Sequence, residues 1–228
     1  MMRDLLLFAA LCLCSALMAQ PVVGIKAGVD RTLTTLSPGD QVPAGTPTSE
    51  VEDGFGYHGG AFAEFNLGDV LFVRPEPHYA VRTFTIRSEF ESPAMLGITA
   101  RVEGEMKVKR STVELPLLFG YRITPRTSVL IGPSARYLLA NHTETNGSAS
   151  IGGLFPGLSV PLSTTDDTVT GLNEWCWEVV AGLNHRLEQG LDLGLRYGHG
   201  IGYLESDTEL LKTRQHVLHL AVGWAFLR

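Results

Sequence analysis

The most regular pattern in this chain is an alternation of bulky apolar side chains with small or polar ones near its end. In a β-strand successive side chains point to opposite faces, so this alternation predicts a strand with one apolar face. One face carries His216, Leu218, Leu220, Val222, Trp224 and Phe226, and the other carries Gln215, Val217, His219, Ala221, Gly223 and Ala225. The two faces of this strand are therefore expected to meet different surroundings.

The same alternation recurs in seven further segments, whose thin face repeatedly carries glycine, Arg and Glu. The eight predicted strands are Val22–Asp30, Phe55–Asn66, Val70–Thr85, Met106–Ile123, Ser128–Leu139, Glu174–Glu188, Leu191–Tyr203 and Arg214–Arg228. A wide apolar exterior around a charged, glycine-rich interior is typical of a transmembrane β-barrel. No apolar run in the body of the chain reaches the length of about 18 residues that a transmembrane helix needs. We therefore predict an all-β fold, an eight-stranded antiparallel up-and-down transmembrane β-barrel.

The connections between these strands alternate in length. Three are predicted as short turns, at Asn66–Asp69, Thr124–Thr127 and Glu188–Gly190. Four are predicted as long loops, at Arg31–Gly54, Ile86–Glu105, Ala140–Asn173 and Leu204–Thr213. Short periplasmic turns and longer extracellular loops are the arrangement of outer-membrane barrels. We expect both termini on the periplasmic side, any binding function in the loops, and mobility in the third loop, which is rich in Gly, Ser, Thr and Pro.

The first 19 residues have the features of a secretory signal peptide. Arg3 supplies a positive charge, Leu5–Leu13 is an apolar stretch, and Ala19 is a small residue at the expected cleavage point. The expected domain organisation is a signal peptide over residues 1–19 and an outer-membrane β-barrel domain over residues 20–228. The mature chain then holds one cysteine, Cys176, which excludes a disulfide framework.

Charged residues on the thin faces are expected to meet inside the barrel. The expected interior ion-pair core consists of Glu64, Arg74, Glu76, Glu114, Arg122, Arg136, Glu178, Arg186 and Arg196. A catalytic acid pair or an ion path is the alternative for these residues. The interior of an eight-stranded barrel is just wide enough for side chains to fill it, and buried charges there must pair. A structural role is therefore favoured over a catalytic site or an ion path.

Four stretches resemble a known family of bacterial proteins. They are Gly24–Val29, Gly60–Gly68, Glu114–Arg122 and Gly190–Tyr197. Together they are similar to the PorT-like outer-membrane β-barrel domain that is common in Bacteroidetes-type bacteria. The resemblance implies a small barrel in the outer membrane. It also implies that secretion or other envelope complexes are candidate partners, because a few members of the family are linked to secretion and gliding machinery.

No residue pattern points to chemistry. The chain has no Gly-x-Ser-x-Gly motif and no His-x-Ser triplet, and Ser128 and Ser134 are predicted to face inward without a nearby base. His216 and His219 have opposite parity on one strand, so they are not expected to hold one metal together. We therefore expect no enzyme activity, no catalytic residues, no cofactor and no metal. The net charge of −6 and the acidic loops disfavour nucleic acid as a partner.

Two other functions remain open at this point. A lipocalin-like barrel that binds a small ligand would place Leu117, Leu195, Leu220 and Trp224 inside. A lipid-modifying enzyme carried on a barrel is the other alternative. The function that the pattern favours is an integral outer-membrane barrel in contact with outer-membrane lipid and lipopolysaccharide. It would be non-enzymatic and non-conducting, with a structural or accessory role in an envelope complex.

Overall fold

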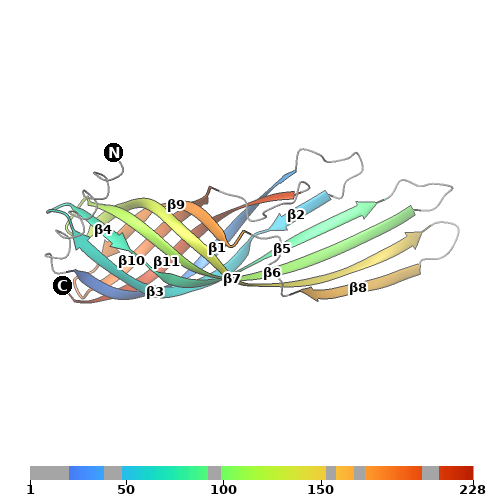
Figure 1. Cartoon of the computed structure of the whole chain (residues 1–228), viewed down its shortest axis with the longest axis horizontal. Coiled ribbons are helices and arrows are strands. Elements are labelled where there is room, and N and C mark those ends of the chain that lie inside the picture. The colour runs from blue at the N-terminus through green and yellow to red at the C-terminus, as the bar shows by residue number, and fades with distance from the viewer. Residues whose placement is uncertain are drawn as a thin grey trace.

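The computed structural model is built from β-strands that wrap into a barrel (Figure 1). It describes residues 21–38, 48–91, 99–152, 158–166, 173–201 and 211–227. The strands are β1 (Val22–Pro38), β2 (Thr48–Glu52), β3 (Gly54–Asn66), β4 (Leu71–Pro75), β5 (His78–Glu91), β6 (Thr99–Arg122), β7 (Thr127–Gly152), β8 (Leu158–Asp166), β9 (Trp175–Arg186), β10 (Leu191–Gly200) and β11 (Leu211–Leu227). Among the described residues no helix is long and apolar enough to cross a membrane.

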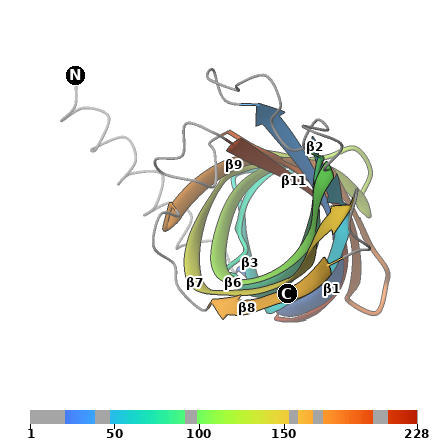
Figure 2. The ribbon, with the colours of Figure 1, turned by 90° about the vertical axis from the view of Figure 1, so that its right-hand side faces the viewer.

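All the strand pairs are antiparallel, and the first and last strands close the ring. β1 pairs with β11 along its whole length, from Val23 opposite Leu227 to Pro38 opposite Leu211. The order around the ring is β1, β3, the β4–β5 crossing, β6, β7, β9, β10 and β11. Viewed along its long axis, the molecule shows the strands as a ring (Figure 2). In the part of the chain that the structure describes, eight crossing strands form this ring, which confirms the predicted fold class.

The third crossing is interrupted where the two prolines of the third predicted strand lie. β4 ends at Pro75 and β5 begins at His78, so Glu76 and Pro77 lie between the two strands. Proline cannot donate a hydrogen bond to the ladder, which explains the break. The neighbouring strands still hold the gap, because Ala61 N donates to the Pro77 carbonyl at 3.0 Å and Glu76 N donates to the Pro116 carbonyl at 3.0 Å.

Three short connections lie together at the end of the barrel where β1 starts and β11 ends (Figure 1). They cover residues 67–70, 123–126 and 187–190, within a residue of the predicted turns. The last of them requires glycine, because Gly190 has a φ of 88°, which L side chains rarely adopt. Leu187 N donates to the Leu191 carbonyl at 2.8 Å and closes this turn.

The expected long loops are wrong for most of the described chain, because strands continue through them. β6 and β7 stay paired from Arg122 opposite Ser128 to Thr99 opposite Gly152, far beyond the ring. β5 follows β6 as far as Glu91, β2 pairs with the outer part of β5, and β8 pairs with the outer part of β7. We call this five-stranded sheet the extension, and it projects from the barrel at the end opposite the short turns (Figure 1). The middle of the expected third loop, including Leu154, lies outside the described residues.

A β-bulge marks the passage from the barrel to the extension. Ser111 lies opposite Ala140, whereas its neighbour Thr112 lies opposite Leu138, so Leu139 is an extra residue on β7. An extra residue bends a strand and increases its local twist. The bulge therefore lies where the two longest strands leave the ring.

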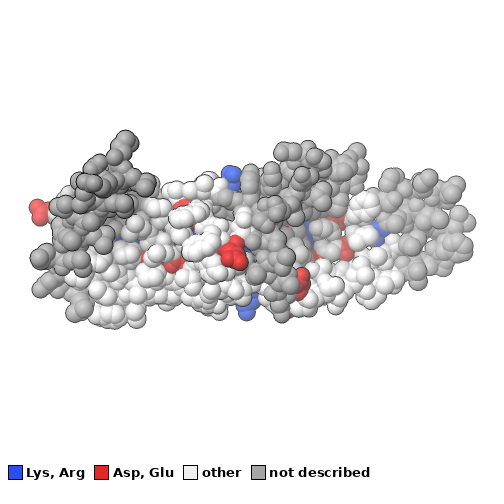
Figure 3. All heavy atoms as spheres, viewed as in Figure 1, with Lys and Arg blue, Asp and Glu red and all other residues white. Residues whose placement is uncertain are grey.

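The outer and inner faces of the barrel follow the predicted alternation. Leu220 and Trp224 are 56% and 45% exposed on the outside, whereas the residues that follow them, Ala221 and Ala225, are buried. The barrel flank visible in Figure 3 carries few Lys, Arg, Asp or Glu atoms at its surface. Leu117 and Leu195 also lie outside, so the lipocalin-like alternative with these leucines inside is wrong. The interior is not wholly polar, because Phe72, Leu118, Leu130 and Val180 form a buried apolar cluster in the lumen.

Candidate functional site

Charged or polar side chains from every crossing of the ring meet in the lumen. Alternation along each strand directs these side chains inward, and the closed ring brings them within reach of one another. These side chains form three connected groups, centred on Glu64, Glu76 and Glu114. The groups follow one another from the end with the short turns toward the extension.

The first group surrounds Glu64 and Asp192 near the short turns. Arg122 Nη2 donates to Glu64 Oε1 at 2.5 Å, and Arg186 Nη2 donates to Glu64 Oε2 at 2.8 Å. Arg186 Nε also donates to Asp192 Oδ1 at 2.7 Å, and Arg74 Nη1 donates to Asp192 Oδ2 at 2.8 Å. Both carboxylates are buried, and each is paired with two arginines.

Glu76 lies at the centre of the second group and has no exposed surface. Lys26 Nζ donates to Glu76 Oε2 at 2.7 Å, and Arg196 reaches both carboxylate oxygens at 2.7 and 2.8 Å. Arg74 Nε lies 2.7 Å from Glu76 Oε1. Three cations from β1, β4 and β10 thus meet one carboxylate in the interrupted third crossing. Because Glu76 follows the end of β4, this meeting point depends on the proline break.

Glu114 organises the third group. Arg82 binds it through both terminal nitrogens, with Nη2 at 2.9 Å from Oε2, and Arg136 Nε donates to Oε1 at 2.7 Å. The Thr112 hydroxyl donates to Oε1 at 3.0 Å, and His78 Nε2 lies 3.0 Å from Oε2. The paired, bidentate contacts suit the fixed fork of an arginine side chain.

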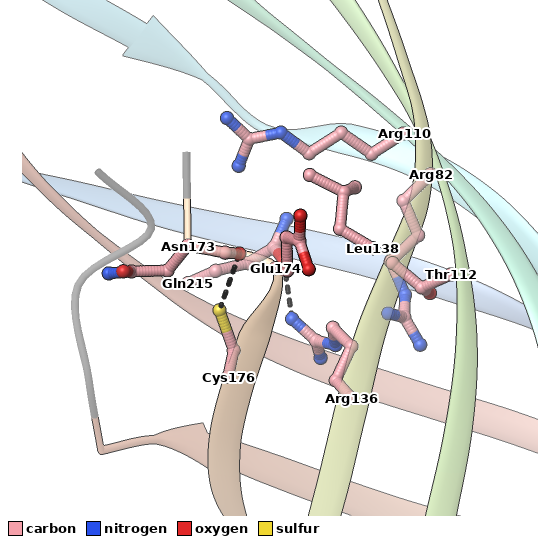
Figure 4. A pocket seen from close by; sticks show the side chains of 9 residues that line it. All are labelled: Arg82, Arg110, Thr112, Arg136, Leu138, Asn173, Glu174, Cys176 and Gln215. Atoms are coloured by element: carbon pink, nitrogen blue, oxygen red, sulfur yellow. Dashed lines mark hydrogen bonds between the residues drawn. The ribbon is translucent and has the colours of Figure 1, made fainter. Parts of the chain in front are cut away.

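A small pocket lies above this group, where the barrel opens toward the extension (Figure 4). Arg136 Nη1 donates to Gln215 Oε1 at 2.7 Å, and Arg136 Nη2 donates to Glu178 Oε2 at 2.7 Å, beneath the pocket. The residues that line it are Arg82, Arg110, Thr112, Arg136, Leu138, Asn173, Glu174, Cys176 and Gln215. The pocket has room for about one water molecule, which is too little for a substrate.

A separate cluster joins the first, second and last strands of the ring. His58 Nδ1 lies 2.7 Å from Asp30 Oδ1, and His219 Nδ1 lies 2.9 Å from the same oxygen. Arg82 Nε donates to the other oxygen, Asp30 Oδ2, at 2.9 Å. Asp30, His58 and His219 are each at most 6% exposed. The carboxylate is thus completely surrounded by nitrogen atoms.

All nine residues expected in the interior lie in the lumen, and each takes part in at least one of the ion pairs given above. Sequence reasoning did not find the Asp30 cluster, because it compared His216 and His219 within one strand only. The sequence pattern could have indicated the cluster, because Asp30, His58 and His219 all fall at inward-facing positions of their strands. Ser134, considered as a nucleophile, is buried in the lumen, and its hydroxyl has no hydrogen-bond partner.

Ion pairs also cross the full width of the lumen. Arg196 meets Glu76, Arg74 meets Asp192, and Arg186 meets Glu64. In each case the two residues come from crossings four places apart in the ring of eight, which are opposite walls of the barrel. Two of the arginines also contact aromatic rings. The guanidinium of Arg74 lies 3.9 Å from the centre of the Phe62 ring, and that of Arg122 lies 4.8 Å from the centre of the Phe72 ring.

Comparison with solved structures finds other outer-membrane barrels. The attachment invasion locus protein Ail of Yersinia pestis, in a crystal with the heparin analogue sucrose octasulfate, is 17% identical. That match covers 92% of this chain and 100% of Ail, with a TM-score of 0.41. Neisserial surface protein A (NspA) is 14% identical, with 89% of this chain and 97% of that chain covered and a TM-score of 0.34. At these TM-scores neither structure carries an argument about this chain.

No curated protein sequence is similar enough to this chain to count as a relative. A family match covers most of it, however: residues 18–204 match the family described as outer membrane protein beta-barrel domain. The match ends before β11, the strand that closes the ring in the structure. The chain therefore belongs to the outer membrane protein beta-barrel domain family, and it is an outer-membrane protein.

Proposed function

We propose that this protein is a non-conducting, non-enzymatic outer-membrane barrel that serves an envelope complex through its extension. The observation that carries the first part is the set of ion pairs between opposite walls, such as Arg196 with Glu76. Paired charges of this kind occupy the width of the lumen, and we infer that no continuous water path runs through it. Removing a partner exposes an unpaired buried charge, so such a network also holds the barrel together. We therefore assign the nine interior residues a structural role.

The same geometry supports the proposal that the barrel has no enzyme activity. The lumen carboxylates Glu64, Glu76 and Glu114 are each bound to at least two cations, so none is poised as a general acid or base. Nucleophilic catalysis by a serine needs its hydroxyl in hydrogen-bond contact with a base. Ser134 lacks such a contact. This supports a role without a catalytic residue, a cofactor or a nucleic-acid partner.

The extension supports the accessory role because its two faces differ. Val102, Ala149 and Val160 are cross-strand neighbours, so they share one face. Val102 and Val160 are 39% and 48% exposed, and Leu162 on the same face is 50% exposed. The opposite face carries ion pairs such as Arg87 with Glu52 at 2.7 Å. A rigid sheet with one uncovered apolar face is the kind of surface that partner proteins bind.

The remaining parts of the proposal concern orientation and processing. We place the short turns and both termini in the periplasm and the extension outside the cell, in keeping with other barrels. We also propose that residues 1–19 are a signal peptide cleaved after Ala19, which leaves residues 20–228 as the barrel domain. The stretches Glu114–Arg122 and Gly190–Tyr197 support a place within the PorT-like group. The apolar exterior is then in contact with outer-membrane lipid and lipopolysaccharide.

Site-specific photo-crosslinking in living cells tests the accessory role. A photoreactive residue is placed at Leu162, on the apolar face of the extension, and in a matched variant at Ser163, on the other face of the same strand. A discrete envelope protein crosslinked at position 162 and not at 163 is the expected result. If neither position, nor Val160, yields a protein adduct in cells, the extension does not serve a complex.

A further inference from the structure

We propose that Asp30, His58 and His219 form a binding site for one divalent transition-metal ion, of the kind represented by Zn²⁺. One carboxylate oxygen and two imidazole nitrogens, the ligand atoms that such ions prefer, all lie within 4.8 Å of one another. The inference is independent of the role proposed above for the lumen and the extension.

The backbone places the three side chains together. Asp30 on β1 lies directly opposite His219 on β11, and Gly28 lies opposite His58 on β3. All three side chains point into the lumen, since all three are buried there. The site therefore spans the seam at which the ring closes, and it exists only in the closed barrel.

Glycine makes the position of His58 feasible. A Cβ atom at Gly28 would lie 2.5 Å from His58 Cε1 and 2.8 Å from His58 Nε2, both too close for real atoms. The imidazole of His58 thus lies against the bare backbone of β1, and this lets its Nδ1 atom reach Asp30. A larger residue at this position would push the ring away from the carboxylate.

The distances are close to those of a metal site. Each Nδ1 atom lies 2.7 or 2.9 Å from Asp30 Oδ1, whereas two ligands of one tetrahedral Zn²⁺ ion, each about 2.0–2.1 Å from the metal, are about 3.3 Å apart. Binding an ion requires each Nδ1–Oδ1 distance to lengthen by about half an ångström. It also requires the two imidazoles to draw together around the ion, since the three ligand atoms lie within 4.8 Å of one another. In the ion-free arrangement both Nδ1 atoms donate to Asp30. With an ion bound, each Nδ1 presents its lone pair to the metal and each Nε2 carries the proton.

The residues around the cluster determine how many ligands the metal ion would have and how tightly it would bind. Arg82 Nε holds Asp30 Oδ2 at 2.9 Å, the position of an outer-shell partner that orients a metal-bound carboxylate. His78 is close, with its ring centre 5.2 Å from that of His58, but its nitrogens face the Glu76 carbonyl and Glu114. We therefore infer three protein ligands and a fourth position for water. The positive charge of Arg82 opposes a cation, so the site should bind more weakly than closed four-ligand sites.

Refolding the purified barrel with Co²⁺ tests the site, because protein-bound Co²⁺ absorbs visible light. Zn²⁺ that displaces the Co²⁺ abolishes this absorption. The wild-type protein should take up one equivalent. His58→Gln and His219→Gln should each weaken uptake by roughly 10-fold or more. His216→Gln is the matched control, since His216 and His199 form an outward-facing pair with ring centres 4.6 Å apart. The control should bind as the wild type does.

Each other outcome counts against the site. No uptake by the folded wild type, uptake undiminished in both lumen variants, or uptake lost in His216→Gln would each overturn it. Folding of every variant is checked by its shift on heating in detergent gels. If the lumen variants do not fold, X-ray absorption of the Zn²⁺-loaded wild type decides the question. Two imidazole ligands are expected, and one or none contradicts the proposal.

Discussion

Glu114 and Arg136 lie directly opposite each other on β6 and β7, and Arg136 Nε donates to Glu114 Oε1 at 2.7 Å. The cross-strand register of the sheet thus places an ion pair in the lumen. Glu114 also binds Arg82 and His78, so it connects three neighbouring crossings of the ring. Its replacement should therefore affect the whole barrel.

Glu114→Ala should lower the free energy of unfolding by about 3–5 kcal/mol, because it leaves buried arginines without their carboxylate. The matched control is Glu105→Ala in the extension. Glu105 is partly exposed and lies 3.4 Å from Lys107 and 3.6 Å from Arg87, so its loss should cost about 1 kcal/mol or less. Urea unfolding from lipid vesicles measures both values. Equal losses in the two variants would mean that the lumen network contributes nothing beyond a surface pair.

Much of the architecture could be predicted from alternation alone. The parity of Leu220 and Ala221 places one outside and the other inside, and the structure confirms this for both. The same rule gave the ring of eight strands. Alternation works here because lipid and a packed lumen are such different surroundings that every residue on a crossing strand must suit one of them.

The extension and the pairing partners could not be predicted in this way. Residues beyond the ring, such as Glu103 and Ser148, are polar enough to resemble a loop, yet they pair in β6 and β7. Backbone hydrogen bonding, not burial, holds these strands, and it leaves little trace in the side chains. Which arginine pairs with which carboxylate depends on the curvature of the closed ring. Arg74 and Asp192, for example, are 118 residues apart in the sequence.

Leu220→Arg should distinguish a lipid-facing surface from a water-facing one. Leu220 is 56% exposed on the barrel, and an arginine near the bilayer midplane costs about 2–4 kcal/mol. Leu162→Arg is the control, because Leu162 is 50% exposed on the extension, which we propose lies outside the bilayer. It should change stability by less than about 0.5 kcal/mol. Unfolding in vesicles measures both, and an unaffected Leu220→Arg variant would show that this face does not meet lipid.

Gly120→Ala tests how tightly the apolar part of the lumen is packed. A Cβ atom there would lie 2.1 Å from Phe72 Cζ, and Leu118, Leu130 and Val180 surround the Phe72 ring. Overpacking of this kind should cost about 1–3 kcal/mol. Gly104→Ala is the matched control in the same strand, since no atom lies within 4 Å of its added Cβ. Thermal melting in detergent that leaves both variants alike would show a loose lumen.

Cysteine labelling tests the orientation of the barrel in the membrane. In a Cys176→Ser background, Ser163→Cys on the extension should react with a membrane-impermeant maleimide in intact cells. Gln189→Cys, in the last short turn, should react only after the outer membrane is opened. Both positions are exposed, so access to the reagent alone decides the outcome. The reverse pattern would place the extension in the periplasm.

Single-channel recording of the purified wild-type protein in a planar bilayer tests the central claim most directly. Ion pairs between opposite walls, such as Arg74 with Asp192, occupy the width of the lumen. We predict no conductance after insertion into the bilayer. Protease resistance of the barrel in vesicles of the same lipid shows separately that the protein inserts. Steady conductance steps from the wild-type protein would contradict a filled lumen and make a small porin the correct description.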